Sequence, residues 1–241
     1  MVLAGVALVG LAVAAALLLA GGDEPAPADK TGDGPVSGAR LLEAADLPGG
    51  PWQVTTDATL AKAGGISGFP SSAVPPSEEC AMVHNFEGEL ARLDASFSSG
   101  ASRVVQREGA PGQSPATVTH TLLVFSDSVD LDPVLGGVAA ALNGPGFGPC
   151  LEQGAGAAGL EATVSPVSAL VPPPNGGAAA GLRLAKRAAP GEAPLILQLF
   201  YWRTGQTLTV VSIVGPESVV TRDLVTEAVA AAQRAFERRS P

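Results

Sequence analysis

The feature that most constrains this chain is an uninterrupted apolar run near its start. Residues 2–20 carry neither a charge nor a polar side chain. As a helix they would span about 28 Å, close to the roughly 30 Å hydrocarbon core of a bilayer. The run is apolar on every face and a polar tail follows it, which disfavours a helix buried inside a globular domain. We therefore expect a transmembrane segment over residues 1–20.

The ends of this run bear on whether it is an anchor or a cleaved signal peptide. It is longer than the roughly 7–15 apolar residues of a signal peptide. A signal peptide also begins with a basic region, and no basic residue precedes this run. The true start therefore lies upstream of Met1 or the basic region is degenerate. Residues 26–28 have the small-x-small pattern of a cleavage site, and residues 19–22 resemble a lipobox in which Gly22 replaces the lipid-bearing Cys. Length favours a single-pass anchor with the C-terminal domain outside the cytoplasm; a secreted protein is the alternative.

The remaining chain divides into a linker and a domain. Residues 21–38 are rich in Gly, Pro and Asp, a composition typical of a flexible linker. Residues 39–238 are long enough for a real core, which must consist mainly of Val, Leu and Ala because aromatic residues make up only 4%. The net charge of −9 and the lack of a Lys/Arg cluster able to neutralise phosphates argue against nucleic-acid binding.

Apolar periodicity predicts an α+β domain. The strand patterns favour an antiparallel sheet with helices packed on one face. A strand at 121–126 and its following helix are echoed by 207–212 and the last helix, which suggests two related strand–strand–helix halves. We expect helices at 39–47, 77–93, 128–142 and from 216 to about 238, and strands at 94–98 and 102–107 (paired around Gly100), 116–126, 160–170, 179–188, 195–203 and 207–214.

The two cysteines, Cys80 and Cys150, predict a structural disulfide. There is no CxxC motif and no nearby pair of histidines, which argues against zinc and against a thioredoxin-type site. Disulfides persist in exported proteins. Closing a loop of about 70 residues would add about 4 kcal/mol to the free energy of unfolding on the chain-entropy argument. Free thiols are the alternative.

Motifs that carry known chemistry are missing from the sequence. There is no GxSxG, no phosphate-binding GxxxxGK[ST] and no strand–GxGxxG–helix unit. Residues 154–159 match GxGxxG only as a string, and we interpret them as a loop because a strand pattern follows. His84 and His120 are too few for a metal site, and His120 shares a strand face with Val118 and Leu122. We expect no cofactor, no metal and no enzymatic activity.

An aromatic cluster at residues 200–203 supplies the candidate ligand-binding residues. In a strand, Tyr201 and Arg203 face one side and Trp202 the other, together with Gln198. We expect the Leu195, Leu197 and Leu199 side to pack under the helices, with Tyr201 and Arg203 at its edge and with Gln198 and Trp202 on the more open face. The candidates are thus Trp202, Gln198, Arg203 and Tyr201; ordinary packing with a snorkelling arginine is the alternative.

Several segments together carry a family resemblance. They are LLEAADLP at 41–48 before Trp52, Cys80 at the head of a helix, the strand–helix–Cys arrangement of 118–150, and the last hairpin with its Ala-rich helix. The domain resembles the actinobacterial extracellular sensor-domain family, which includes the periplasmic domain of a mycobacterial membrane Ser/Thr kinase and related lipoproteins. The excess of Arg over Lys, with 30 Gly and 21 Pro, is typical of a high-GC genome.

This resemblance covers nearly all of residues 39–238. It implies an antiparallel sheet with helices and a cleft for an unknown ligand. The kinase sensor has two disulfides, whereas only one is possible here, and this sequence contains no kinase domain.

The function predicted from these features is that of a membrane-anchored, extracytoplasmic, non-enzymatic ligand-binding or sensor domain of the bacterial cell envelope. One alternative is an envelope accessory protein that binds a protein partner. A second is a hydrolase with an unrecognised site. An enclosed pocket would favour a small ligand, and an exposed apolar patch would favour a protein partner.

Overall fold

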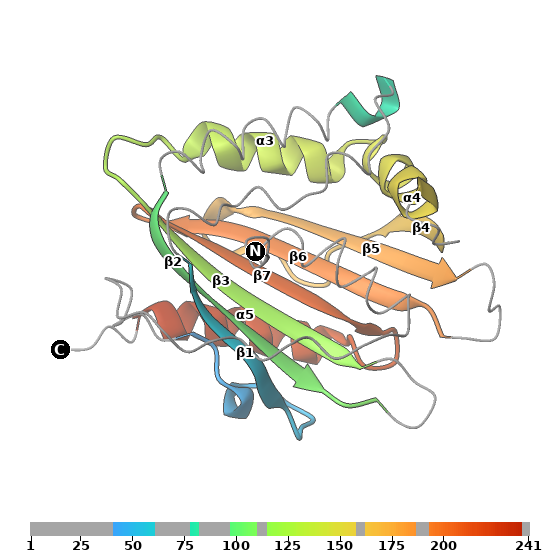
Figure 1. Cartoon of the computed structure of the whole chain (residues 1–241), viewed down its shortest axis with the longest axis horizontal. Helices are drawn as coiled ribbons and strands as arrows, with labels where there is room; N and C mark the ends of the chain where they lie inside the picture. Colours follow the sequence, from blue (N-terminus) through green and yellow to red (C-terminus); the bar gives the residue numbers. More distant parts are fainter. Residues whose placement is uncertain are drawn as a thin grey trace.

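The computed structural model describes residues 41–60, 78–81, 97–109, 115–157, 162–186 and 193–237. These form a seven-stranded antiparallel sheet with helices (Figure 1), which confirms the α+β class. The predicted anchor at 1–20 and linker at 21–38 lie outside the described residues. Within the described ranges no helix has the length and apolar character needed to cross a bilayer.

The sheet has the strand order β1-β2-β3-β7-β6-β5-β4. The strands and helices have these bounds: η1 (Ala44–Asp46), β1 (Gln53–Leu60), η3 (Glu78–Cys80), β2 (Phe97–Arg107), β3 (Ala116–Phe125), α3 (Asp132–Asn143), α4 (Phe147–Ala157), β4 (Ala162–Val167), η4 (Pro174–Gly176), β5 (Ala178–Lys186), β6 (Leu195–Thr204), β7 (Thr207–Pro216) and α5 (Arg222–Glu237).

Each face of the sheet carries its own core. On one face, α3 and α4 cover the β6 side chains of Leu195, Leu197 and Leu199. On the other face, α5 packs on Phe200 and Trp202 of the same strand. Figure 1 shows α3 and α5 on opposite sides of the sheet. The prediction that the helices share one face is therefore wrong: β6 is buried on both faces from residue 195 to 202 and needs a cover on each.

The two halves of the sheet do not repeat each other. If the two halves were related, a two-fold axis would exchange them. This axis would lie between β3 and β7 and stand normal to the sheet, because these neighbouring strands are antiparallel. Such an axis would leave both following helices on one face. Since α3 and α5 belong to the two different cores, the prediction of two related strand–strand–helix halves is not supported.

Some predicted elements differ from the observed ones. In the described part of the two segments expected to pair around Gly100, residues 97–107 form one continuous strand, β2, whose outer neighbour is β1. Residues 154–157 continue α4. The prediction of a loop at 154–159 is therefore wrong for these four residues. A 3-10 turn, η1, replaces the helix expected at 39–47. Most of the helix expected at 77–93 lies outside the described residues.

Candidate functional site

Trp202 is part of the core. Its side chain is 1% exposed and packs with α5 residues such as Leu224 and Val225. Gln198, on the same face of β6, is fully buried. The expectation that these two residues lie on an open face is therefore wrong, because the apolar stripe of α5 covers that face.

Gln198 fixes the chain that follows β4. Its side-chain oxygen accepts a hydrogen bond from the Leu170 N–H at 2.8 Å, and its amide nitrogen donates to the Ser168 carbonyl at 3.5 Å. Residue 181, which pairs with Gln198, must be glycine. A Cβ at this position would come within 2.5 Å of the Gln198 amide nitrogen and 2.8 Å of the Val167 carbonyl oxygen. Gln198 thus holds residues 168–170 on the α5 side of the sheet.

Tyr201 and Arg203 lie on the α3 side, as predicted for this face. Tyr201 is 1% exposed, burial raises the pKa of its phenol, and its hydroxyl has no hydrogen-bond partner among the described residues. Arg203 is partly exposed and forms an ion pair with Asp132 at the start of α3, with its Nε 3.1 Å from a carboxylate oxygen. The four predicted ligand-binding residues therefore face opposite sides of the sheet and do not converge on one ligand.

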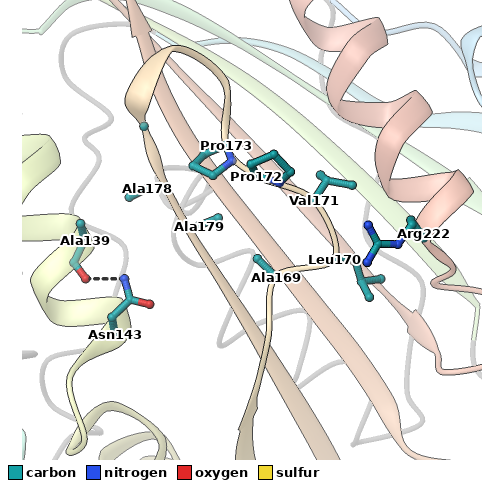
Figure 2. A pocket seen from close by; sticks show the side chains of 11 residues that line it. Ala139, Asn143, Ala169, Leu170, Val171, Pro172, Pro173, Ala178, Ala179 and Arg222 are labelled. Atoms are coloured by element: carbon teal, nitrogen blue, oxygen red, sulfur yellow. Dashed lines mark hydrogen bonds between the residues drawn. The ribbon is translucent and has the colours of Figure 1, made fainter.

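A groove that the sequence analysis did not single out lies beside the first residues of β5. It has a volume of about 490 Å³ and is open to solvent (Figure 2). We call it the β5 groove. Its lining comes from α3, the β4–β5 connection, β5 and α5: Ala139, Asn143, Ala169, Leu170, Val171, Pro172, Pro173, Gly177, Ala178, Ala179 and Arg222.

The β5 groove exists because β4 is shorter than its neighbour. Pairing between β4 and β5 ends at Val167 opposite Gly181, whereas β5 continues to Ala178 opposite Tyr201 of β6. Beyond Val167 the chain is drawn toward Gln198 and leaves the sheet edge. Among the described residues, residues 178–180 therefore have a strand neighbour on one side only.

The alternating direction of main-chain N–H and C=O groups along a strand shows which of them point out of the β5 edge. The N–H of Val164 donates to a Glu152 carboxylate oxygen at 3.4 Å, and Pro166 has no N–H. Even-numbered residues of β4 thus turn their peptide groups away from β5, and odd-numbered ones turn toward it. Val167 pairs with Gly181, so Gly181 faces β4 and Ala179, two residues earlier, faces the open edge. Among the described residues nothing hydrogen-bonds to this outer N–H and C=O of Ala179.

Among the described residues, Arg222 is the one charged side chain that lines the β5 groove. It is the first residue of α5 and is exposed. The ion pairs between described residues use Arg103, Arg183, Arg203 and Arg234, and none includes Arg222. The groove therefore combines apolar walls with the outward N–H and C=O of Ala179 and the guanidinium of Arg222, and these polar groups have no partner among the described residues.

The disulfide between Cys80 and Cys150 is confirmed. Their Cα atoms are 5.2 Å apart, and the bridge joins η3 to α4 across a sequence separation of 70 residues. Both cysteines are fully buried in the same core as Leu131 and Phe147. In the described ranges, no group of three or more His, Cys, Asp or Glu side chains is placed to hold a metal ion.

His120 is buried in the middle of β3, as its apolar neighbours predict. Its Nδ1 accepts a hydrogen bond from the Leu42 N–H at 3.0 Å, so the ring proton resides on Nε2. Burial, and to a smaller extent the charge of Arg103, lowers the pKa of His120 to about 3. This neutral ring holds the start of the described chain on the sheet. His84 lies outside the described residues.

Comparison with known proteins does not assign a family to this chain. No protein-family model matches the sequence, and no curated protein matches it. The resemblance to the actinobacterial sensor domains therefore stays a prediction.

Proposed function

We propose that this chain is a membrane-anchored, extracytoplasmic domain of the bacterial cell envelope that binds a ligand in the β5 groove without chemical turnover. The observation that carries this proposal is the groove itself, whose mostly apolar lining includes Arg222 and Ala179, and the outward N–H and C=O of Ala179 have no hydrogen-bond partner among the described residues. Binding sites have this composition: mostly apolar walls with a few polar groups that orient the ligand.

The placement outside the cytoplasm is supported by two separate features. The apolar run at 2–20 has the length of a membrane-spanning helix, and the linker at 21–38 would separate the domain from the membrane surface. The buried bridge between Cys80 and Cys150 suits an oxidising compartment. A sensor role, as the family resemblance implies, is consistent with a binding domain held at a membrane.

An envelope accessory protein that binds a protein partner is the second candidate. The observation that favours it is the position of the β5 groove, which is open and runs along a strand edge, where extended peptides bind other proteins. No such observation favours the hydrolase alternative, because the described residues that line the groove include no Ser, Cys, His, Asp or Glu.

Recovery of bound compounds tests the proposed site. The tagged full-length protein would be purified from an actinobacterial host, and co-purifying compounds would be identified by mass spectrometry. Ala169→Trp would fill the β5 groove, whereas Ala45→Trp places the same ring on an exposed position of η1 and is the matched control. We expect the bound compound to be lost from the first variant and kept by the second. Its retention in Ala169→Trp would show that the β5 groove is not the site.

A further inference from the structure

We propose that the β5 groove accepts an extended peptide that bears a carboxylate. The peptide adds as a short strand beside residues 178–180, and its carboxylate pairs with Arg222. This inference rests on the proposed function, because it names the class of ligand for the same site.

The free edge of β5 calls for a ligand with a peptide backbone. Ala179 presents one donor and one acceptor in the geometry of an unfinished antiparallel ladder. A residue of an extended peptide satisfies both groups at once. The added strand would lie in the β5 groove, which borders this edge, at the usual spacing of about 4.8 Å between strands.

The walls of the β5 groove are fixed before a ligand arrives. Pro172 and Pro173 restrict the backbone of the β4–β5 connection, and Gln198 holds Leu170 by a buried hydrogen bond. At the other end of the connection a Cβ on Gly177 would collide with the Tyr201 carbonyl oxygen, so only glycine allows this close approach to β6. A preformed site loses little conformational entropy when a peptide binds.

The charge pattern selects an anionic peptide. The molecule carries a formal net charge of −9, yet the only ionised group among the described residues that line the groove is the Arg222 guanidinium. A guanidinium forms paired hydrogen bonds with a carboxylate. A free inorganic anion would satisfy Arg222 and leave both groups of Ala179 unpaired. An extended peptide with a carboxylate satisfies the cation and the strand edge together.

Two libraries of random heptapeptides test the inference with full-length protein in detergent. In one library the carboxylate is the free C-terminus and Asp and Glu are omitted; in the other the C-terminus is amidated and one position is Asp or Glu. The library that yields binders identifies the source of the carboxylate. Dissociation constants of selected peptides would be measured by fluorescence anisotropy for the wild type and for each variant.

Single substitutions measure separately how much the Arg222 charge and the free edge of β5 contribute to peptide binding. Arg222→Gln should weaken binding by about 10-fold or more, because it removes a charge-assisted hydrogen bond. Arg234→Gln makes the same change about 18 Å further along α5 and should leave binding unchanged. Ala179→Pro removes the outward N–H and should weaken binding by about 5-fold or more; its ring faces the open edge, as that of Pro166 does in β4.

Amide hydrogen exchange of the wild-type protein gives an independent readout. The Ala179 amide should exchange rapidly in the free protein and at least about 10-fold more slowly with a selected peptide bound, whereas the Ala180 amide, which faces β6, should be protected in both states. Unchanged exchange at Ala179 with a peptide bound would overturn the added strand.

Failure of this inference can be told apart from failure of the proposed function. If neither library yields a binder, or if selected peptides bind Arg222→Gln and Ala179→Pro as tightly as the wild type, the peptide inference is overturned. The proposed function would survive that result if Ala169→Trp still loses a compound that the wild type and Ala45→Trp retain.

Discussion

At the scale of single residues, His120 gives the domain a pH-dependent stability. The folded state holds the ring neutral with a pKa of about 3, whereas an unfolded chain binds a proton near the ordinary pKa of about 6.5. The contribution of His120 to the free energy of unfolding is thus fully present above about pH 6.5 and declines as the pH falls toward 3. Between pH 7.5 and pH 5 we expect the free energy of unfolding to drop by about 2 kcal/mol from this group.

Urea unfolding at both pH values measures this loss. His120→Asn keeps a side-chain acceptor for the Leu42 N–H but does not titrate, so the drop between pH 7.5 and 5 should shrink in that variant. An equal drop in the variant and the wild type would show that other groups cause it.

The burial of Trp202 makes a second prediction at this scale. Trp202→Ala should lower the free energy of unfolding by about 3–5 kcal/mol, because the indole fills the core under α5. Val54→Ala removes a side chain that is 46% exposed and should change it by less than about 0.5 kcal/mol. Both are measured by urea unfolding followed by circular dichroism. A small loss for Trp202→Ala would contradict the buried position.

Strand alternation explains why residue-level prediction succeeded in part on β6. It correctly separated Leu195, Leu197 and Leu199 from Trp202. It could not say that the Trp202 face would also be covered, because alternation along a strand does not show on which face of the sheet the following helix, α5, packs. The apolar run of the strand, which Gln198 alone interrupts between residues 195 and 202, was the available signal for burial on both faces.

At the scale of elements, the disulfide binds α4 into the domain. Replacing both cysteines, Cys80→Ser with Cys150→Ser, should lower the free energy of unfolding by about 4 kcal/mol, as expected for a closed loop of this length. Peptide mapping without reductant should show the two cysteine peptides linked in the wild type. Equal unfolding curves with and without reductant would contradict a stabilising bridge.

Elements with strong local patterns were predicted well, and those held by tertiary contacts were not. The last hairpin, expected at 195–203 and 207–214, agrees closely with β6 and β7, because long apolar strands flank a turn at Gly205 with φ of 60°. β1 was missed because it is an exposed edge strand with no apolar alternation. α4 was missed because its glycines disfavour a helix, which buried Phe147 and the disulfide of Cys150 hold in place.

At the scale of the whole molecule, the β5 groove was not visible in the sequence. Asn143, Pro172 and Arg222 come from three separate elements and meet only because β4 stops short of the end of β5. Each residue alone has an ordinary local interpretation: Asn143 as the last residue of a helix, Pro172 in a turn and Arg222 on a helix surface. The strand register decides that they lie together, and register is a property of the assembled sheet.

The position of the protein in the cell is the last prediction at this scale. The apolar run at 2–20 should keep the full-length protein in the membrane fraction after an alkaline carbonate wash, because it matches the thickness of a bilayer core. A shortened chain that begins at Asp29 lacks this run and should be soluble, with the same circular dichroism and thermal midpoint as the domain released by proteolysis of the linker. Both samples would be followed by immunoblotting. Mature protein found in the culture medium with Asp29 at its N-terminus would instead identify the run as a cleaved signal peptide, since cleavage after residues 26–28 removes the apolar run.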